Sequence, residues 1–164
     1  MHHQPDGAAF DVVLVLHVGC VVAGFVTALA AATTGSRLGR LLASGTPLPE
    51  ALRRYFRPGV NWAGRTVYGI PIFGVALLAM SQGADAPGDA WVQAGIALFV
   101  ALALVGEGAL WPAERRLQAA VAAAGEGPLA DVAASSRDAT TMARAATAAL
   151  VLLAAGTVLM VAQP

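Results

Sequence analysis

The sequence predicts an all-α integral membrane protein, a bundle of four transmembrane helices arranged as two antiparallel hairpins with helical cytoplasmic extensions. Apolar residues make up 57% of the 164 residues, charged residues make up 12%, and the mean hydropathy is +0.67. This composition is typical of membrane proteins and not of soluble globular domains. We therefore expect a single integral membrane domain over residues 1–164.

Four stretches are long and apolar enough to cross a bilayer, because a hydrocarbon core about 30 Å thick needs about 20 residues of helix. Their unbroken apolar character excludes the strands of a membrane barrel, in which apolar and polar residues alternate. We predict spans at residues 11–32, 59–80, 90–111 and 143–162. The start "MHHQPDGAAFD" has no basic residue, so we expect the first helix to be retained and not cleaved as a signal peptide.

The connections between the spans contain helical pieces of their own. In the first connection, "PEALRRYF" is amphipathic, and its arginines can meet anionic headgroups. Pro71 is expected to kink the second span, because proline removes a backbone donor. The third span should continue as a helix to about Ala124, turn at "GEGP" and resume near Leu129.

The arginines predict the orientation of the chain. All ten basic residues are arginine, and all except Arg65 lie within or at the edges of the two long connections. The N-terminus and the short connection "SQGADAPGDA" carry only acids, so both termini should lie outside the cytoplasm of a bacterial inner membrane. The ten acids balance the ten arginines, and we expect no nucleic-acid partner.

His17 is the only histidine in any predicted span, and it lies about 9 Å below the outer boundary. Cys20 and Gly24 share its helical face. Three interpretations compete. His17 could ligate a cofactor, either a haem or chlorophyll-type tetrapyrrole with Met160, or copper with Cys20, Met80 and Met160. It could relay protons. It could also fix packing through a hydrogen bond to Thr157, Gln93 or a backbone carbonyl, which is the interpretation we favour.

A second candidate site lies at the cytoplasmic ends of the middle spans. Asn61, Arg65 and Tyr68 are spaced to share one helical face, and Glu107 reaches the same level from the third span. An ion pair between Arg65 and Glu107 could gate an inner mouth, or it could fix helix register. We favour the structural role, because paired charges are the usual way to make such residues tolerable in a membrane.

Short motifs along the chain resemble those of a bacterial family of predicted integral membrane proteins, domain of unknown function family 2269. They are Leu16-His17 in the first span, "WPAERRL" after the third and the terminal "LMVAQP". Gln163 stands where that ending is expected to have lysine. A looser similarity joins the chain to copper-resistance membrane proteins. The resemblance implies a four-span fold and a membrane location, and it implies no activity.

No motif of a soluble enzyme is present, such as a phosphate loop, a zinc pair or a nucleophile elbow. We therefore expect a non-enzymatic accessory or scaffold subunit that associates with itself or with other membrane subunits of an energy-transducing complex. The alternative is a tetrapyrrole- or copper-binding protein with His17 as ligand. A small transporter is a third hypothesis, and we disfavour it because only Arg65 and Glu107 could serve as charged pathway residues.

Overall fold

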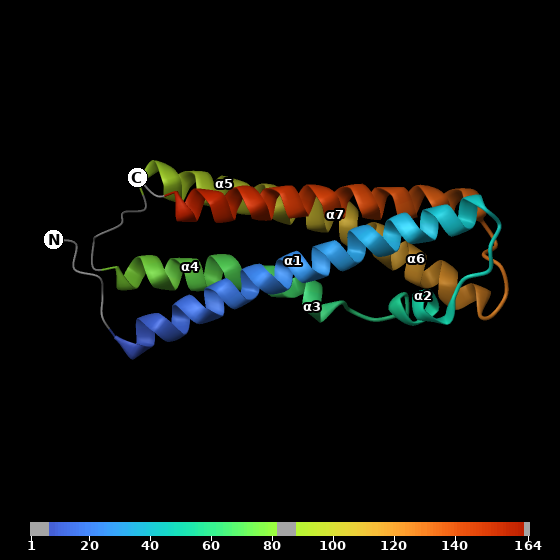
Figure 1. The fold of residues 1–164 in the computed structure, drawn as a ribbon, viewed down its shortest axis with the longest axis horizontal. Helices are drawn as coiled ribbons and strands as arrows, with labels where there is room; N and C mark the ends of the chain where they lie inside the picture. Colours follow the sequence, from blue (N-terminus) through green and yellow to red (C-terminus); the bar gives the residue numbers. More distant parts are fainter. Residues whose placement is uncertain (1–6, 82–87, 163–164) are drawn as a thin grey trace. The chain divides into compact units, whose positions relative to one another are not determined.

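The computed structural model describes residues 7–81 and 88–162, of which 84% are helical and none is in a strand. The elements in chain order are α1 (Ala8–Ala43), α2 (Glu50–Tyr55), α3 (Trp62–Arg65), the 3₁₀ turn η1 (Thr66–Tyr68), α4 (Gly69–Met80), α5 (Ala90–Val105), the π-helical turn η2 (Gly106–Leu110), α6 (Trp111–Ala124) and α7 (Val132–Val161). Figure 1 labels these seven α-helices. The predicted all-α class is confirmed.

Four continuous helical stretches are long and apolar enough to cross a membrane, as predicted: Ala8–Ala43, Trp62–Met80, Ala90–Ala124 and Val132–Val161. Three of them are much longer than the spans predicted from hydropathy, and α1 continues to Ala43. Hydropathy shows where the apolar side chains end. The helix itself continues until a proline, a glycine or a capping residue ends it. The short connection predicted after α4 includes residues 82–87, which lie outside the described residues.

The second stretch begins with a cap and changes its winding before Pro71. The side chain of Asn61 accepts a hydrogen bond from the Gly64 N–H at 3.0 Å, which caps α3. Pro71 has no N–H to donate to the carbonyl of Val67, and the 3₁₀ turn η1 lies immediately before α4 at that point. The winding thus changes one turn before Pro71, and the kink expected at Pro71 stays a prediction.

The third stretch contains the π-helical turn η2 just before Pro112. The Trp111 N–H donates to the carbonyl of Gly106, five residues back. Pro112 cannot donate to the carbonyl of Gly108, so the regular ladder fails at this level. A Cβ at Gly106 would lie 3.0 Å from the Trp111 ring, and glycine therefore lets the indole pack on the turn.

The junction of α6 and α7 follows the predicted turn with one correction. The helix ends at Ala124, as predicted, and Gly125 takes the left-handed φ of 54° that suits glycine. The next helix begins at Val132, and the prediction of a restart near Leu129 was wrong. The Asp131 side chain accepts the Ala134 N–H at 2.8 Å, so this N-cap sets where α7 starts.

The chain forms two compact units, and both contain parts of α1, α5 and α7. The first unit comprises Met1–Thr27, Asn61–Ala101 and Val151–Pro164, and the second comprises Ala28–Val60 and Leu102–Leu150. In the first unit, α4 has no buried residue, and most of the large apolar side chains that this chain leaves exposed belong to this unit. These uncovered faces are suited to lipid contact.

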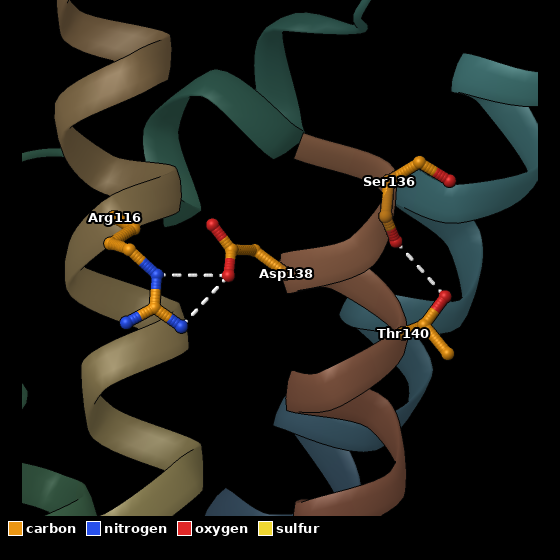
Figure 2. A network of polar contacts seen from close by, with 4 residues as sticks. All are labelled: Arg116, Ser136, Asp138 and Thr140. Carbon is orange, nitrogen blue, oxygen red and sulfur yellow. Dashed lines mark hydrogen bonds and ion pairs between the residues drawn. The ribbon is translucent and has the colours of Figure 1, made fainter. Parts of the chain in front are cut away.

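The second unit contains most of the buried core. Its fully buried large side chains are Phe56, Leu38, Leu117 and Met142. A polar network joins the surfaces of α6 and α7, where the Arg116 guanidinium contacts Asp138 through Nε at 2.9 Å and Nη2 at 2.8 Å (Figure 2). Arg116 is exposed, so this pair contributes at most about 1 kcal/mol to stability.

Glycine sets the distance between α1 and α7 in the second unit. A Cβ at Gly35 would lie 2.9 Å from the carbonyl oxygen of Ala139 and 3.0 Å from the backbone nitrogen of Ala143. Both atoms belong to the backbone of α7 and cannot move aside as a flexible side chain would. Glycine on α1 and alanines on α7 therefore let the two backbones approach closely at this contact.

We expect Gly35→Ala to lower the free energy of unfolding by about 1 to 3 kcal/mol, because the two backbones must separate. Gly39→Ala on the same helix is the matched control, since a Cβ at Gly39 meets nothing within 4 Å. It should be neutral or stabilising by up to about 1 kcal/mol, through helix propensity. Denaturant unfolding in mild detergent measures both, and equal stabilities of the two variants would contradict this packing.

Candidate functional site

The first predicted site lies in the first unit, where α1 meets the segment from η1 to α4. His17, Cys20 and Gly24 lie on one face of α1, as predicted. A Cβ at Gly74 would lie 3.4 Å from Cε1 of His17, and one at Gly69 would collide with Sγ of Cys20. A Cβ added at Gly24 would lie 3.1 Å from Cγ1 of Val67. Two glycines of α4 thus face the thiol and the imidazole, and Gly24 of α1 faces Val67.

His17 is almost completely enclosed by the protein. Only 4% of its surface is exposed, although the residues beside it in the sequence, Leu16 and Val18, are largely uncovered. The ring hydrogen-bonds to the backbone of Ile70. A backbone carbonyl was one of the three hydrogen-bond partners expected if His17 has a structural role.

The nitrogen Nδ1 of His17 is buried and has no hydrogen-bond partner among the described residues. A backbone carbonyl can only accept, so the ring donates to Ile70, and the available donor is Nε2–H. Nδ1 then carries the lone pair in a neutral ring. An unpaired buried acceptor costs about 1 to 3 kcal/mol, and it marks the position as one that packing alone does not explain.

The other residues expected around His17 have different surroundings. The Thr157 hydroxyl donates to the carbonyl of Leu153 in its own helix at 2.9 Å. Gln93 is exposed, and Met160 is 38% exposed in the last turn of α7. Met80 ends α4, about 9 Å along the helix axis from Gly74, which faces the imidazole.

Few side chains near His17 could act as metal ligands. Cys20 is a half-buried free thiol one turn from His17. Within residues 7–81 and 88–162, no three histidine, cysteine, aspartate or glutamate side chains gather in a way that could hold a metal ion. A metal at His17 would therefore depend on Nδ1 and on a sulfur ligand such as Cys20.

The second predicted site involves residues of both units. Arg65 is the last residue of α3 in the first unit, and Glu107 is exposed in η2 of the second unit. The Arg65–Glu107 ion pair stays a prediction. Tyr68, which was expected beside Arg65, packs edge to face against Phe99, with ring centroids 6.1 Å apart.

A polar clamp in the second unit was missed in the sequence. The Arg53 guanidinium donates to the carbonyls of Gly125, Glu126 (3.0 Å) and Gly127 (3.1 Å), and its Nε donates to Leu48 at 3.3 Å. These carbonyls follow the C-terminal end of α6, where cations are favoured. The expectation that every arginine of "PEALRRYF" is available to headgroups was therefore wrong for Arg53.

Buried polar residues of α6 and α7 were also missed. Glu114, Gln118 and Ser135 are buried in the second unit, and Glu114 and Gln118 lie one turn apart on the face of α6 that also buries Leu117. Burial and the nearby Glu114 raise the pKa of the Tyr55 phenol, so Tyr55 stays protonated at neutral pH. The burial of Glu114 and Gln118 could have been predicted from the sequence, because the two residues are four apart along an apolar helix face.

Removing the clamp should loosen α2. We expect Arg53→Ala to lower the free energy of unfolding by about 1 to 3 kcal/mol, because the carbonyls at the turn lose a charged donor. Arg54→Ala is the control, since the Arg54 side chain is exposed and has no polar partner among the described residues. Proteolysis between α1 and α3 should accelerate in Arg53→Ala alone, and unchanged protection would contradict the clamp.

Comparison with known proteins adds no family or activity to this geometry. No protein-family model, curated protein or solved structure matches the chain. The resemblance to domain of unknown function family 2269 stays a prediction from the three short motifs.

Proposed function

We propose that this chain is a non-enzymatic, multi-pass protein of a bacterial cytoplasmic membrane. It acts as an accessory or scaffold subunit that joins other membrane subunits of an energy-transducing complex or other copies of itself. Its four helices cross the bilayer as two antiparallel hairpins. The lengths and apolar character of the four helical stretches support the membrane assignment.

The distribution of arginine supports an orientation with both termini outside the cytoplasm. Nine of the ten arginines belong to the second unit, and Arg65 is the only one in the first. Seven of those nine have exposed side chains that form no hydrogen bond or ion pair with another described residue: Arg37, Arg40, Arg54, Arg57, Arg115, Arg137 and Arg144. Arginine-rich segments are retained on the cytoplasmic side.

The observation that carries the proposed association is a set of glycines on helix faces that this chain does not cover. A Cβ added at Gly19, Gly95 or Gly156 would meet nothing within 4 Å. Each glycine costs about 1 kcal/mol of helix propensity relative to alanine, and packing within the chain does not require it. In lipid, small residues let helices of different subunits approach closely, so these faces suit contact with another transmembrane helix.

Association can be tested in membranes of the source cell, solubilised in a mild detergent. We expect the protein to migrate in a native gel as part of a species larger than its 16.5 kDa monomer with bound detergent. Gly95→Leu or Gly156→Leu should shift it toward the monomer, because a large side chain blocks the approach. Val100→Leu, which enlarges an exposed apolar side chain on α5, is the control. Migration of the unaltered protein solely as a monomer would overturn the proposal.

The unpaired Nδ1 of His17 favours a second candidate function, the binding of a soft metal ion such as copper. A neutral imidazole lone pair and a nearby thiol are ligands that Cu(I) accepts. A tetrapyrrole would need the imidazole to turn outward, because the ring is 4% exposed and Nε2 serves Ile70.

Purified protein would then contain copper in proportion to protein or show the absorption bands of a tetrapyrrole, and His17→Ala would abolish either signal. Leu16→Ala, which truncates the exposed neighbouring side chain, should leave the signal unchanged. Colourless, metal-free protein that takes up no added Cu(I) would eliminate this second candidate. Metal analysis and an absorption spectrum of one preparation provide both measurements.

A further inference from the structure

The short helix α2 has one buried and one exposed side, and its orientation is fixed. Leu52 is 4% exposed and Phe56 is fully buried, so this side belongs to the core of the second unit. Arg53 holds the same helix to the carbonyls of residues 125–127. The remaining side chains of α2 are therefore presented in a defined direction, and α2 is not a loose amphipathic segment.

Two arginines lie close together on the exposed side. The side chains of Arg54 and Arg57 are exposed and have no hydrogen bond or ion pair with any other residue in the described part of the chain. The backbone N–H of Arg57 donates to the carbonyl of Arg54 at 3.4 Å, so the two residues belong to one turn. Two guanidinium groups at this spacing can donate several hydrogen bonds to one phosphate group.

Apolar side chains follow these arginines and point to a bilayer as the source of that phosphate. Pro58 is exposed, and Val60 is 58% exposed. Basic and apolar side chains together on one exposed surface are typical of segments that lie in the headgroup region. A soluble acidic ligand would not require the exposed valine.

The chain itself keeps this segment close to the membrane. The apolar stretch that begins at Trp62 is only five residues beyond Arg57, which limits their separation to about 18 Å even when fully extended. The headgroup layer on each side of the hydrocarbon is several ångströms thick. Whenever that stretch spans the bilayer, the chain therefore keeps Arg57 within about 18 Å of the start of the span.

We infer that Arg54, Arg57 and Val60 form a docking surface for the headgroups of anionic phospholipids. The arginines bind the phosphate, and the valine contacts the adjoining hydrocarbon. The inference rests on the membrane embedding proposed above, and it is independent of which subunits the protein joins. It assigns the selection of the surrounding lipids to the end of α2 and the segment that follows it.

The selection can be measured on the full chain in nanodiscs with equal amounts of phosphatidylglycerol and phosphatidylcholine. Native mass spectrometry counts the lipids that stay bound after release from the nanodisc. We expect the unaltered protein to retain more phosphatidylglycerol than phosphatidylcholine. In R54Q/R57Q this enrichment should fall by about fivefold for each arginine removed. Fivefold corresponds to the contribution of about 1 kcal/mol that one basic residue makes near an anionic surface. R54K/R57K keeps the charges and should keep most of the enrichment.

Two further variants separate this surface from general electrostatics and from misfolding. R115Q/R137Q removes two other arginines whose exposed side chains have no polar partner among the described residues, and it should leave the enrichment nearly unchanged. Glu50→Gln removes the one acid of α2, four residues before Arg54, and should raise the enrichment. Equal binding of the two lipids by the unaltered protein would overturn the inference. So would equal losses in the two double-glutamine variants. Association in native gels is a separate measurement, so a failure here would leave the proposed subunit role standing.

Discussion

Positions without side chains set how closely the helices pack, and the rest of each unit depends on that distance. In the second unit, Gly35 brings the backbone of α1 against that of α7. In the first, Gly69 and Gly74 receive the thiol of Cys20 and the imidazole of His17. Between lipid-exposed helices the hydrophobic effect supplies little attraction, because lipid tails are as apolar as leucine. Close van der Waals contact must supply it, and a methyl group at Gly35 would prevent the contact, because it would meet the backbone of α7.

Polar groups within the apolar stretches are mostly satisfied inside their own helices. The hydroxyls of Thr27, Thr33, Thr147 and Thr157 donate to carbonyls three or four residues earlier. These bonds let threonine occupy a helix in lipid without a partner on another helix. His17 differs, because it reaches another segment through Ile70 and still leaves one nitrogen unpaired. Packing alone therefore does not explain why a histidine occupies position 17.

Hydropathy predicted the four apolar stretches, because a run of about 20 apolar residues matches the thickness of the hydrocarbon core and rarely occurs in a soluble domain. Helical spacing also placed His17, Cys20 and Gly24 on one face, since a periodicity of 3.6 residues is a local property. The partners across that face were harder to predict. Thr157 was one of three alternative partners for His17, but its hydroxyl donates to the carbonyl of Leu153 in its own helix. Arg53 was assigned to lipid because its contacts, more than seventy residues away in the sequence, depend on tertiary structure.

The π-helical turn η2 has a consequence for the direction in which α6 faces. A π turn accommodates one additional residue in an α-helix, and each residue advances the helix by about 100°. The side chains of α6 are therefore rotated by about that angle from where an uninterrupted continuation of α5 would put them. Leu117 and Val121, which are buried, lie on the face set by this phase shift. The turn thus behaves as a one-residue insertion. A regular α-helix through the same residues would turn Arg116 toward the face that Leu117 now occupies, whereas a chain shortened by one residue between Gly106 and Leu110 would lose the π turn and keep Leu117 facing the core.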